Sequence, residues 1–477
     1  MIFPILHIPV LGDGMTIALD AVLHVLISHG LAIGAVSMVV LFQALGANGR
    51  GAFWTDLGRS LLGPLVVATT SVGAVTGVGI WFITGALAPA GIGSLIHLFF
   101  WPWFIEWGAF TAEVVLLLFY YYLWPRLAEE RPKALLALGL GYVGMAVLSG
   151  ILISGILGFM LTPDGWPSGQ RFVEAYFNPT FVPQCFLRIF GGLSMGALVA
   201  LAWTAWTFKG AEDERRRALR LCGLVAIGAA LVAGVAGVVY FQRVPQTYLT
   251  HWVFAVATSA LSQRPEALTW INAGAGAVLL LAALAGLAGR RTASRLLALP
   301  ALILCVGLVA EFERVREFVR GPYLLPGYMY ANQIPLVQNL AAERAGMLPE
   351  LRWVREASEE APAARSGRAL FDANCGVCHS IGGVNDIRQR IAGRTLEGVN
   401  ALTGITQQMV PFMTPFSGTE AERLTLSTYL YALANTDSRP APQLLKRKSP
   451  AAKPAAKPVA TTATAGQNAA QAKEKKQ

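Results

Sequence analysis

The chain has 477 residues, enough for roughly two or three domains. Hydrophobic residues make up 54% of it and charged residues only 14%, whereas ordinary soluble domains carry about 25% charged residues, so a single soluble domain is excluded. The net charge of +10 does not indicate a nucleic-acid partner, because much of it lies after Pro440 in an Ala/Pro/Lys tail without apolar periodicity. We expect no nucleic-acid binding and a disordered basic tail over residues 437–477.

Long apolar segments fill the first two thirds of the chain. Crossing a bilayer takes about 20 mostly apolar residues, and about eight segments reach that length. They run Thr16–Leu45, Leu61–Leu87, Ser94–Trp124, Ala134–Leu161, Phe181–Phe208, Ala218–Phe241, Thr269–Leu287 and Leu296–Val319. The sequence therefore predicts an all-α fold: a transmembrane bundle over residues 1–330, a connector over 331–362 and a small all-α domain over 363–436.

Basic residues alternate between the connectors of these segments. Most Lys and Arg of the loops follow the first, third, fifth and seventh segments, while the N-terminus and the other connectors carry only Arg171, Arg243 and Arg264. Cytoplasmic loops of membrane proteins are enriched in Lys and Arg. We therefore expect a multi-pass protein of the bacterial inner membrane, embedded in lipid, with the N-terminus and the region after the eighth segment on the periplasmic side.

Ionisable residues occur inside the first and third apolar segments. His24 and His29 lie about 140° apart around one helix, so they cannot both face one metal. Glu106 and Glu113 are nearly two helical turns apart, so they share one face at a separation of about 10 Å along the axis. Because ionisable groups in a bilayer are costly and usually functional, the two carboxylates are candidates for a proton relay.

The eighth segment ends in a charged stretch, Glu311–Arg320, at the outer interface. Charge pairing along the helix and cofactor ligation are both open interpretations of it.

Cys375-Gly-Val-Cys378-His379 is a C-x-x-C-H haem-attachment motif. Two thiols at this spacing can add to the two vinyl groups of one porphyrin, and the adjacent imidazole then reaches the iron from one face. Met409 and Met413, in a Pro-rich loop, are candidates for the second iron ligand, and a thioether ligand raises the potential. We expect one covalent haem c; the alternative, a zinc or redox pair, lacks a second Cys pair.

The segment around this motif resembles class I cytochrome c. A helix is expected at Gly367–Asn374, and a capping box, Thr419-Glu-Ala-Glu422, opens a last helix that runs to Leu433. By resemblance, Met413 matches the position of the sixth ligand best. Haem attachment to such motifs takes place on the outer side of the bacterial membrane, which agrees with the loop charges.

The membrane part resembles subunit I of the cytochrome bd oxidase family over most of residues 15–330. The stretches that carry the resemblance are Ala21-Val-Leu-His24, Phe104-Ile-Glu106-Trp-Gly with Glu113, and Glu317-Phe-Val-Arg320-Gly-Pro322-Tyr323.

This resemblance implies roles for individual residues. His24 would be the axial ligand of the high-spin haem that handles oxygen, Glu317 the carboxylate ligand of a neighbouring haem, and Arg320 a neighbour of the haem propionates. Glu106 and Glu113 would line the proton path. The resemblance also implies one or two non-covalent haems of b or d type and a hetero-oligomer with other respiratory membrane subunits.

Three departures from the family pattern are visible. Pro183–Arg188 contains no His where the family has a low-spin haem ligand, and Thr269–Leu287 contains no Met for the opposite ligand. The connector Gln242–Leu268 is short for the family's quinol-binding insert. We therefore expect the tethered haem c to exchange electrons with the outer-facing membrane haems and with a soluble periplasmic carrier.

Three functions remain in competition. The first is an oxidase module that takes electrons from quinol or through haem c and reduces oxygen. The second is an electron-conducting subunit of a larger respiratory complex without oxygen chemistry of its own. The third is a haem-free membrane anchor that carries a cytochrome c. The sequence leaves open whether the chain is an enzyme.

Overall fold

The computed structural model describes residues 6–169, 171–250, 265–351 and 362–435. The predicted tail, residues 251–264 of the sixth connector and residues 352–361 of the connector after the eighth helix lie outside these ranges. Within them the chain is helical apart from turns and one two-stranded antiparallel sheet, formed by β1 (Tyr323–Leu325) and β2 (Met329–Tyr330). The predicted all-α class is confirmed.

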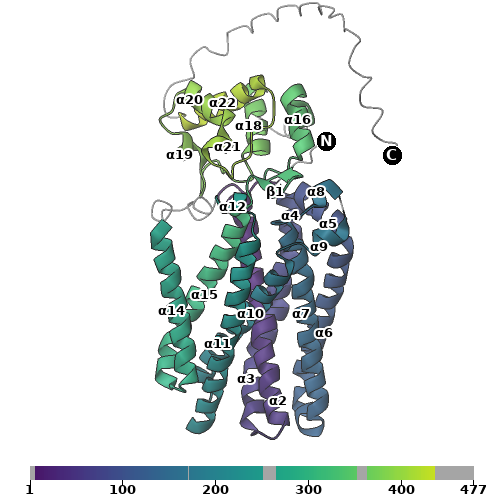
Figure 1. The fold of residues 1–477 in the computed structure, drawn as a ribbon, viewed down its shortest axis with the longest axis vertical. Helices are drawn as coiled ribbons and strands as arrows, with labels where there is room; N and C mark the ends of the chain where they lie inside the picture. The colour runs from purple at the N-terminus through teal and green to yellow at the C-terminus, as the bar shows by residue number, and fades with distance from the viewer. Residues whose placement is uncertain (1–5, 170, 251–264, 352–361, 436–477) are drawn as a thin grey trace, which may run out of the picture. The chain divides into compact units, whose positions relative to one another are not determined.

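Eight spans in the described part of the chain are long and apolar enough to cross a membrane, as predicted. Figure 1 shows them as one bundle of long helices. Two spans are composite, because π-helical turns interrupt them: α1 (Asp13–Val25), η1 (Leu26–Ala35) and α2 (Val36–Ala47), then α3 (Phe53–Val67), η2 (Ala68–Gly73) and α4 (Ala74–Leu87). The other six are built on α6 (Phe100–Glu130), α7 (Pro132–Phe159), α10 (Phe181–Thr207), α11 (Glu212–Arg243), α14 (Pro265–Leu287) and α15 (Arg291–Val319).

The outer faces of the spans are apolar. Phe82 is 80% exposed, Trp270 76% and Leu296 71%. A contiguous apolar surface of this kind is unfavourable in water and suits the hydrocarbon of a bilayer.

Glycines allow the backbones of η1 and α10 to touch. A Cβ atom built on Gly34 would lie only 2.0 Å from the Gly192 carbonyl oxygen, and one on Gly196 would lie 2.1 Å from the Gly34 carbonyl carbon. Small residues at membrane helix interfaces permit such close approach. Any larger side chain at these positions would separate η1 from α10.

The third predicted segment begins later than expected. We expected it at Ser94, but a separate helix, α5 (Pro89–Leu98), ends there, and α6 starts at Phe100. Phe99 leaves the helical conformation, and its ring is fully buried against Phe159, with the centroids 5.0 Å apart. Burial of this ring explains the break. Three other short helices near the ends of the spans are α8 (Trp166–Gly169), α9 (Phe172–Tyr176) and α12 (Gln246–Leu249).

The region after the sheet has its own hydrophobic core. Its elements are α16 (Leu336–Ala345), η4 (Leu348–Leu351), α18 (Pro362–Asn374), α19 (Ile387–Ile391), α20 (Leu396–Gly404), α21 (Thr406–Met409) and α22 (Glu420–Ala434). The predicted capping box is confirmed: Glu422 N–H donates to Thr419 Oγ1 at 3.3 Å, and Thr419 N–H donates to Glu422 Oε2 at 3.0 Å. Met347 and Leu351 of the predicted connector pack into the same core.

Candidate functional site

His24 lies near the end of α1 and faces α4. Its Nδ1 is 3.3 Å from Thr76 Oγ1, and the Thr76 hydroxyl donates to the Val72 carbonyl at 2.8 Å. Because the hydroxyl hydrogen is used there, Thr76 accepts from Nδ1–H of His24, which leaves the lone pair on Nε2. Histidines that ligate a metal are commonly oriented by such a second group. Gly77 adds room beside the ring, since a Cβ there would lie 2.9 Å from His24 Cε1. The surroundings of His24 fit an iron ligand.

His29 occupies a different face of the same span. It is buried in η1, its Nδ1 lies 3.0 Å from Ser28 Oγ, and its Nε2 has no hydrogen-bond partner among the described residues. A Cβ on Gly192 of α10 would lie 3.2 Å from His29 Cβ, so His29 packs on α10 rather than α4. His24 and His29 therefore face different helices, as their spacing predicts. π-helical turns such as η1 occur frequently at functional sites.

Glu106 and Glu113 both face α7. Ser149 Oγ donates to Glu106 Oε1 at 2.8 Å, and Tyr142 OH lies 3.2 Å from Glu113 Oε1. The same Tyr142 hydroxyl lies 3.0 Å from the carbonyl oxygen of Ala32 in η1. Tyr142, which the sequence did not single out, thus links the carboxyl group on α6 to the helix that carries His29. A role for the two carboxylates in proton transfer remains a prediction.

A buried ion pair joins α10 to α15. Arg188 Nη2 donates to Glu313 Oε1 at 2.5 Å, and Arg316 Nε donates to Glu313 Oε2 at 3.1 Å. All three side chains are largely buried. Arg188 belongs to the stretch Pro183–Arg188, which contains no His, and its side chain takes part in charge pairing. The sequence gives no signal for this pairing, because its partners are 125 residues apart.

Glu317 and Arg320 lie one helical turn further on and are paired with each other. Arg316 Nη2 is 3.8 Å from Glu317 Oε2. Arg320 is 1% exposed, and its Nε and Nη1, together with Arg316 Nη1, are buried without a partner among the described residues. Buried guanidinium donors of this kind require an acceptor, and a carboxylate matches their geometry. These donors fit a carboxylate such as a haem propionate, and the propionate role of Arg320 stays a prediction.

The C-x-x-C-H motif forms a helical turn directly after α18. Cys375 N–H donates to the Phe371 carbonyl at 2.7 Å, and His379 N–H donates to the Cys375 carbonyl at 2.8 Å. This turn places both cysteines and the histidine in one loop. Asn385 Nδ2 donates to the Cys378 carbonyl at 2.6 Å and holds the loop from the other side.

The side chains of this loop suit covalent haem attachment. Cys375 and Cys378 are both free thiols rather than a disulfide. Burial raises the pKa of Cys375 to about 12 and lowers that of His379 to about 4. His379 is therefore neutral near pH 7 and can offer a nitrogen lone pair to iron. The donor set fits haem c, which is still a prediction.

The two candidate methionines differ in exposure. Met409 ends α21 and is 47% exposed, whereas Met413 is more buried, in a turn where its N–H donates to the Val410 carbonyl at 2.8 Å. A less exposed thioether is better shielded from water, so Met413 remains the preferred candidate, and its role as haem ligand stays a prediction.

The motif loop contacts the ends of two membrane helices. Gly14 N–H, in the first turn of α1, donates to the carbonyl of Val377 at 3.1 Å. Phe412, next to Met413, packs on Phe318 of α15 with the ring centroids 5.4 Å apart. The candidate haem c residues thus adjoin the helices that carry His24 and Glu317.

Comparisons with known proteins bear on the membrane part. Residues 15–248 match the sequence profile of the family Cytochrome bd terminal oxidase subunit I. The bd oxidase from Geobacillus thermodenitrificans has a similar structure, with a TM-score of 0.55 and 20% sequence identity over 67% of this chain and 90% of that chain. At that identity the structural likeness concerns the fold alone. No curated protein matches the chain.

The matched range includes His24, Glu106, Glu113 and Arg188, while Glu317, Arg320 and the C-x-x-C-H motif lie beyond it. Residues 15–248 therefore resemble the cytochrome bd terminal oxidase subunit I family, within a chain whose described part contains eight candidate membrane spans.

Proposed function

We propose that this subunit passes electrons between a covalent haem c, held by Cys375, Cys378 and His379 with Met413, and haem bound in the membrane at His24. The observation that carries the proposal is the hydrogen bond from Gly14 N–H to the Val377 carbonyl. It joins the motif loop to the helix on which His24 lies ten residues later, about 15 Å along the axis.

The residues around the membrane site bind and orient the haem. His24 offers Nε2 to the iron, and Thr76 fixes the ring through Nδ1. Glu317 is the carboxylate proposed for a second iron, and its pairing with Arg320 competes with that role. The unpaired donors of Arg316 and Arg320 support propionate binding. Bound haem would supply one-electron transfer and the chemistry of oxygen reduction.

Protons for oxygen reduction arrive along α6 in this proposal. Glu106 and Glu113 hold exchangeable protons next to the hydroxyl groups of Ser149 and Tyr142. Tyr142 extends this row of polar groups to η1 through the Ala32 carbonyl. A carboxyl group beside neutral hydroxyls can gain or lose a proton without breaking an ion pair, which suits a relay.

The proposed location is the bacterial inner membrane, with the N-terminus and the cytochrome c region on the periplasmic side. The contacts of Val10 and Gly14 with residues 384 and 377 support placing both on one side. Other respiratory membrane subunits complete a hetero-oligomer, and a soluble periplasmic carrier or quinol is the electron donor. We assign the chain a terminal oxidase activity in that assembly.

An electron-conducting subunit without oxygen chemistry is the second candidate. The observation in its favour is the ion pair of Arg188 with Glu313, which lies near the start of α10, where the stretch Pro183–Arg188 contains no His. Oxygen uptake by the purified protein with a reduced donor separates the two functions.

Haem content tests the proposal directly. A pyridine haemochrome spectrum before and after acid–acetone extraction should show one covalent haem c and at least one extractable haem per chain. His24→Ala should lose extractable haem and keep haem c, and Cys375→Ala with Cys378→Ala should do the reverse. His97→Ala, at an exposed histidine of α5, is the matched control and should lose neither. An unmodified protein without extractable haem would refute the proposal.

A further inference from the structure

The residues before α1 connect the membrane bundle to the C-x-x-C-H region. Leu6 N–H donates to the carbonyl of Ala86 at the end of α4, at 3.2 Å. Val384 N–H, after the motif, donates to the Val10 carbonyl at 3.0 Å, and Gly14 N–H donates to the Val377 carbonyl at 3.1 Å. The segment therefore has backbone contacts with both regions over a few residues.

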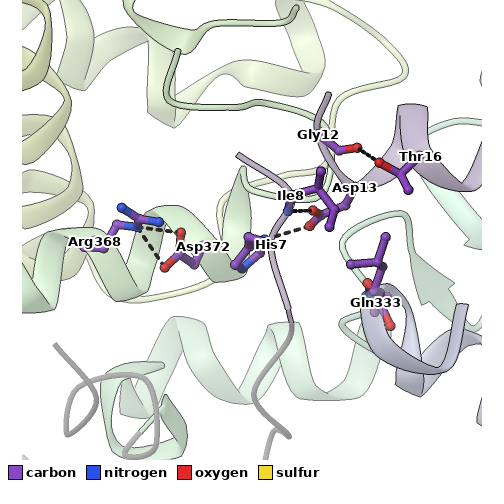
Figure 2. Close-up of polar contacts among 9 residues, drawn as sticks. His7, Ile8, Gly12, Asp13, Thr16, Gln333, Arg368 and Asp372 are labelled. Carbon is purple, nitrogen blue, oxygen red and sulfur yellow. Dashed lines mark hydrogen bonds and ion pairs between the residues drawn. The ribbon is translucent and has the colours of Figure 1, made fainter. Parts of the chain in front are cut away.

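Asp13 holds this segment in shape. It is 1% exposed, its Oδ1 accepts from Ile8 N–H at 2.9 Å, and its Oδ2 accepts from His7 Nδ1–H at 2.7 Å. In Figure 2 the Asp13 carboxylate, at the start of the helix, contacts both His7 and Ile8. As a negative charge in the first turn of α1, Asp13 also interacts favourably with the helix dipole.

His7 extends the contact from Asp13 to helix α18. It lies between Asp13 and Asp372, and Arg368 Nε donates to both oxygens of Asp372 at 2.8 and 3.0 Å (Figure 2). A Cβ on Gly376, inside the motif, would lie 2.9 Å from His7 Cε1. The side chain of His7 is thus pressed against the loop that carries the two cysteines.

A second glycine of the loop region fits the same segment. Gly383 has φ +95° and a Cβ there would lie 2.1 Å from the Val10 carbonyl oxygen. Both the backbone conformation and the space require glycine at this position. The fit at Gly376 and Gly383 makes the contact specific in shape as well as in charge.

From these contacts we infer that residues His7–Gly14 are the docking element that fixes the C-x-x-C-H loop at the start of α1, with Asp13 as its positioning residue. The inference rests on the proposed function, because it assigns the element the task of setting the distance for electron transfer between haem c and the His24 haem. Asp13 touches neither haem; it acts through Ile8, His7 and the first turn of α1.

Two variants of Asp13 separate its charge from its hydrogen bonds. Asp13→Ala removes both, whereas Asp13→Asn keeps an acceptor for Ile8 N–H and removes the charge. Asp164→Asn, at an exposed aspartate of the loop after α7, is the matched control. His7→Ala removes the hydrogen bond between His7 and Asp13 from the other side. It leaves Asp13 in place in the first turn of α1.

Amide hydrogen exchange at Gly14 and Val384 measures docking without any haem activity. We expect roughly tenfold faster exchange at both amides in Asp13→Ala and His7→Ala, a smaller change in Asp13→Asn, and none in Asp164→Asn. Unchanged exchange in both Asp13→Ala and His7→Ala would overturn the docking element, whatever the protein's electron-transfer activity.

The positioning role is tested by rapid reduction of haem c and the rate at which the membrane haem is then reduced. Docking variants should slow this step at least tenfold with the midpoint potential of haem c unchanged. An unchanged rate despite faster amide exchange would overturn the role of Asp13. If haem c in the unmodified protein does not reduce the membrane haem, the proposed function is refuted. The amide exchange at Gly14 and Val384 would still decide whether residues His7–Gly14 are a docking element.

Discussion

Two sets of membrane carboxylates differ in the partners that the fold gives them. Glu106 and Glu113 of α6 meet the neutral hydroxyls of Ser149 and Tyr142, whereas Glu313 of α15 meets the guanidinium groups of Arg188 and Arg316. A proton on a carboxylate of the second set would break an ion pair, while one on the first set breaks none. The same residue type thus has neutral hydrogen-bond partners on α6, where proton exchange is predicted, and forms ion pairs on α15.

The largest expected effect is the loss of Glu313. Glu313→Ala leaves the guanidinium groups of Arg188 and Arg316 buried without their counter-charge, and breaking such a pair costs about 3–5 kcal/mol. Thermal unfolding monitored by tryptophan fluorescence should show a large drop in midpoint. Glu106→Ala is the comparison and should cost much less. Equal losses from the two variants would contradict the distinction between the two sets.

Proton delivery should depend on the first set. Glu113→Gln keeps the size of the side chain and removes its proton exchange, so oxygen uptake should fall on the order of 10²-fold. Haem spectra and the unfolding midpoint should stay as in the unmodified protein. Glu311→Gln, in the C-terminal half of α15, is the control and should retain activity. Full oxygen uptake by Glu113→Gln would remove Glu113 from the proton path.

Tyr142 should contribute less than Glu113. Tyr142→Phe removes the hydroxyl between Glu113 and the Ala32 carbonyl and leaves the ring in place, which costs about 1 kcal/mol for the lost hydrogen bonds. We expect a several-fold slower oxygen uptake together with a larger solvent isotope effect. A slower rate with an unchanged isotope effect would indicate a packing role only.

The smallest expected effect is a pH dependence at the docking element. Burial lowers the pKa of His7, but the hydrogen bond to Asp13 and the charge of Asp372 outweigh it and raise the pKa above 6.5. A group with a raised pKa stabilises the folded contact fully below its unfolded value of 6.5, and this stabilisation is lost as the pH rises through the folded pKa.

Amide exchange at Val384, corrected for its intrinsic pH dependence, should therefore accelerate above about pH 6.5 in the unmodified protein. His7→Ala should show no such acceleration. A protection factor that stays constant between about pH 6 and 9 would show that His7 carries no titrating charge into the contact.

Patterns local in the sequence predicted much of this structure. The eight spans and the capping box at Thr419 follow from runs of apolar residues and from spacings of three residues. The shared face of Glu106 and Glu113 follows from helical geometry in the same way. The C-x-x-C-H motif is likewise recognised from the spacing of its own residues along the sequence.

Other features depend on partners that lie far apart in the chain. Arg188 pairs with Glu313, and Gly14 meets Val377, and no periodicity links the members of either pair. The break at Phe99 depends on burial of its ring against Phe159. Because the stretch is apolar on both sides of Phe99, its hydropathy gives no signal of the break. The roles predicted for the ligand residues rest on the motif and on the resemblance. The structure adds the hydrogen bonds and packing contacts of these residues.

The π-helical turns of η1 have a consequence for how the first span tolerates change. They lie between His24 and α2, so the angular phase of His24 relative to the buried helix α2 is set there. Deleting one residue within η1 to give regular α-helical hydrogen bonding would rotate His24 by about 100°. The imidazole would then leave Thr76 on α4, although every side chain of the site would still be present. Length within this segment therefore constrains the site as strictly as residue identity does.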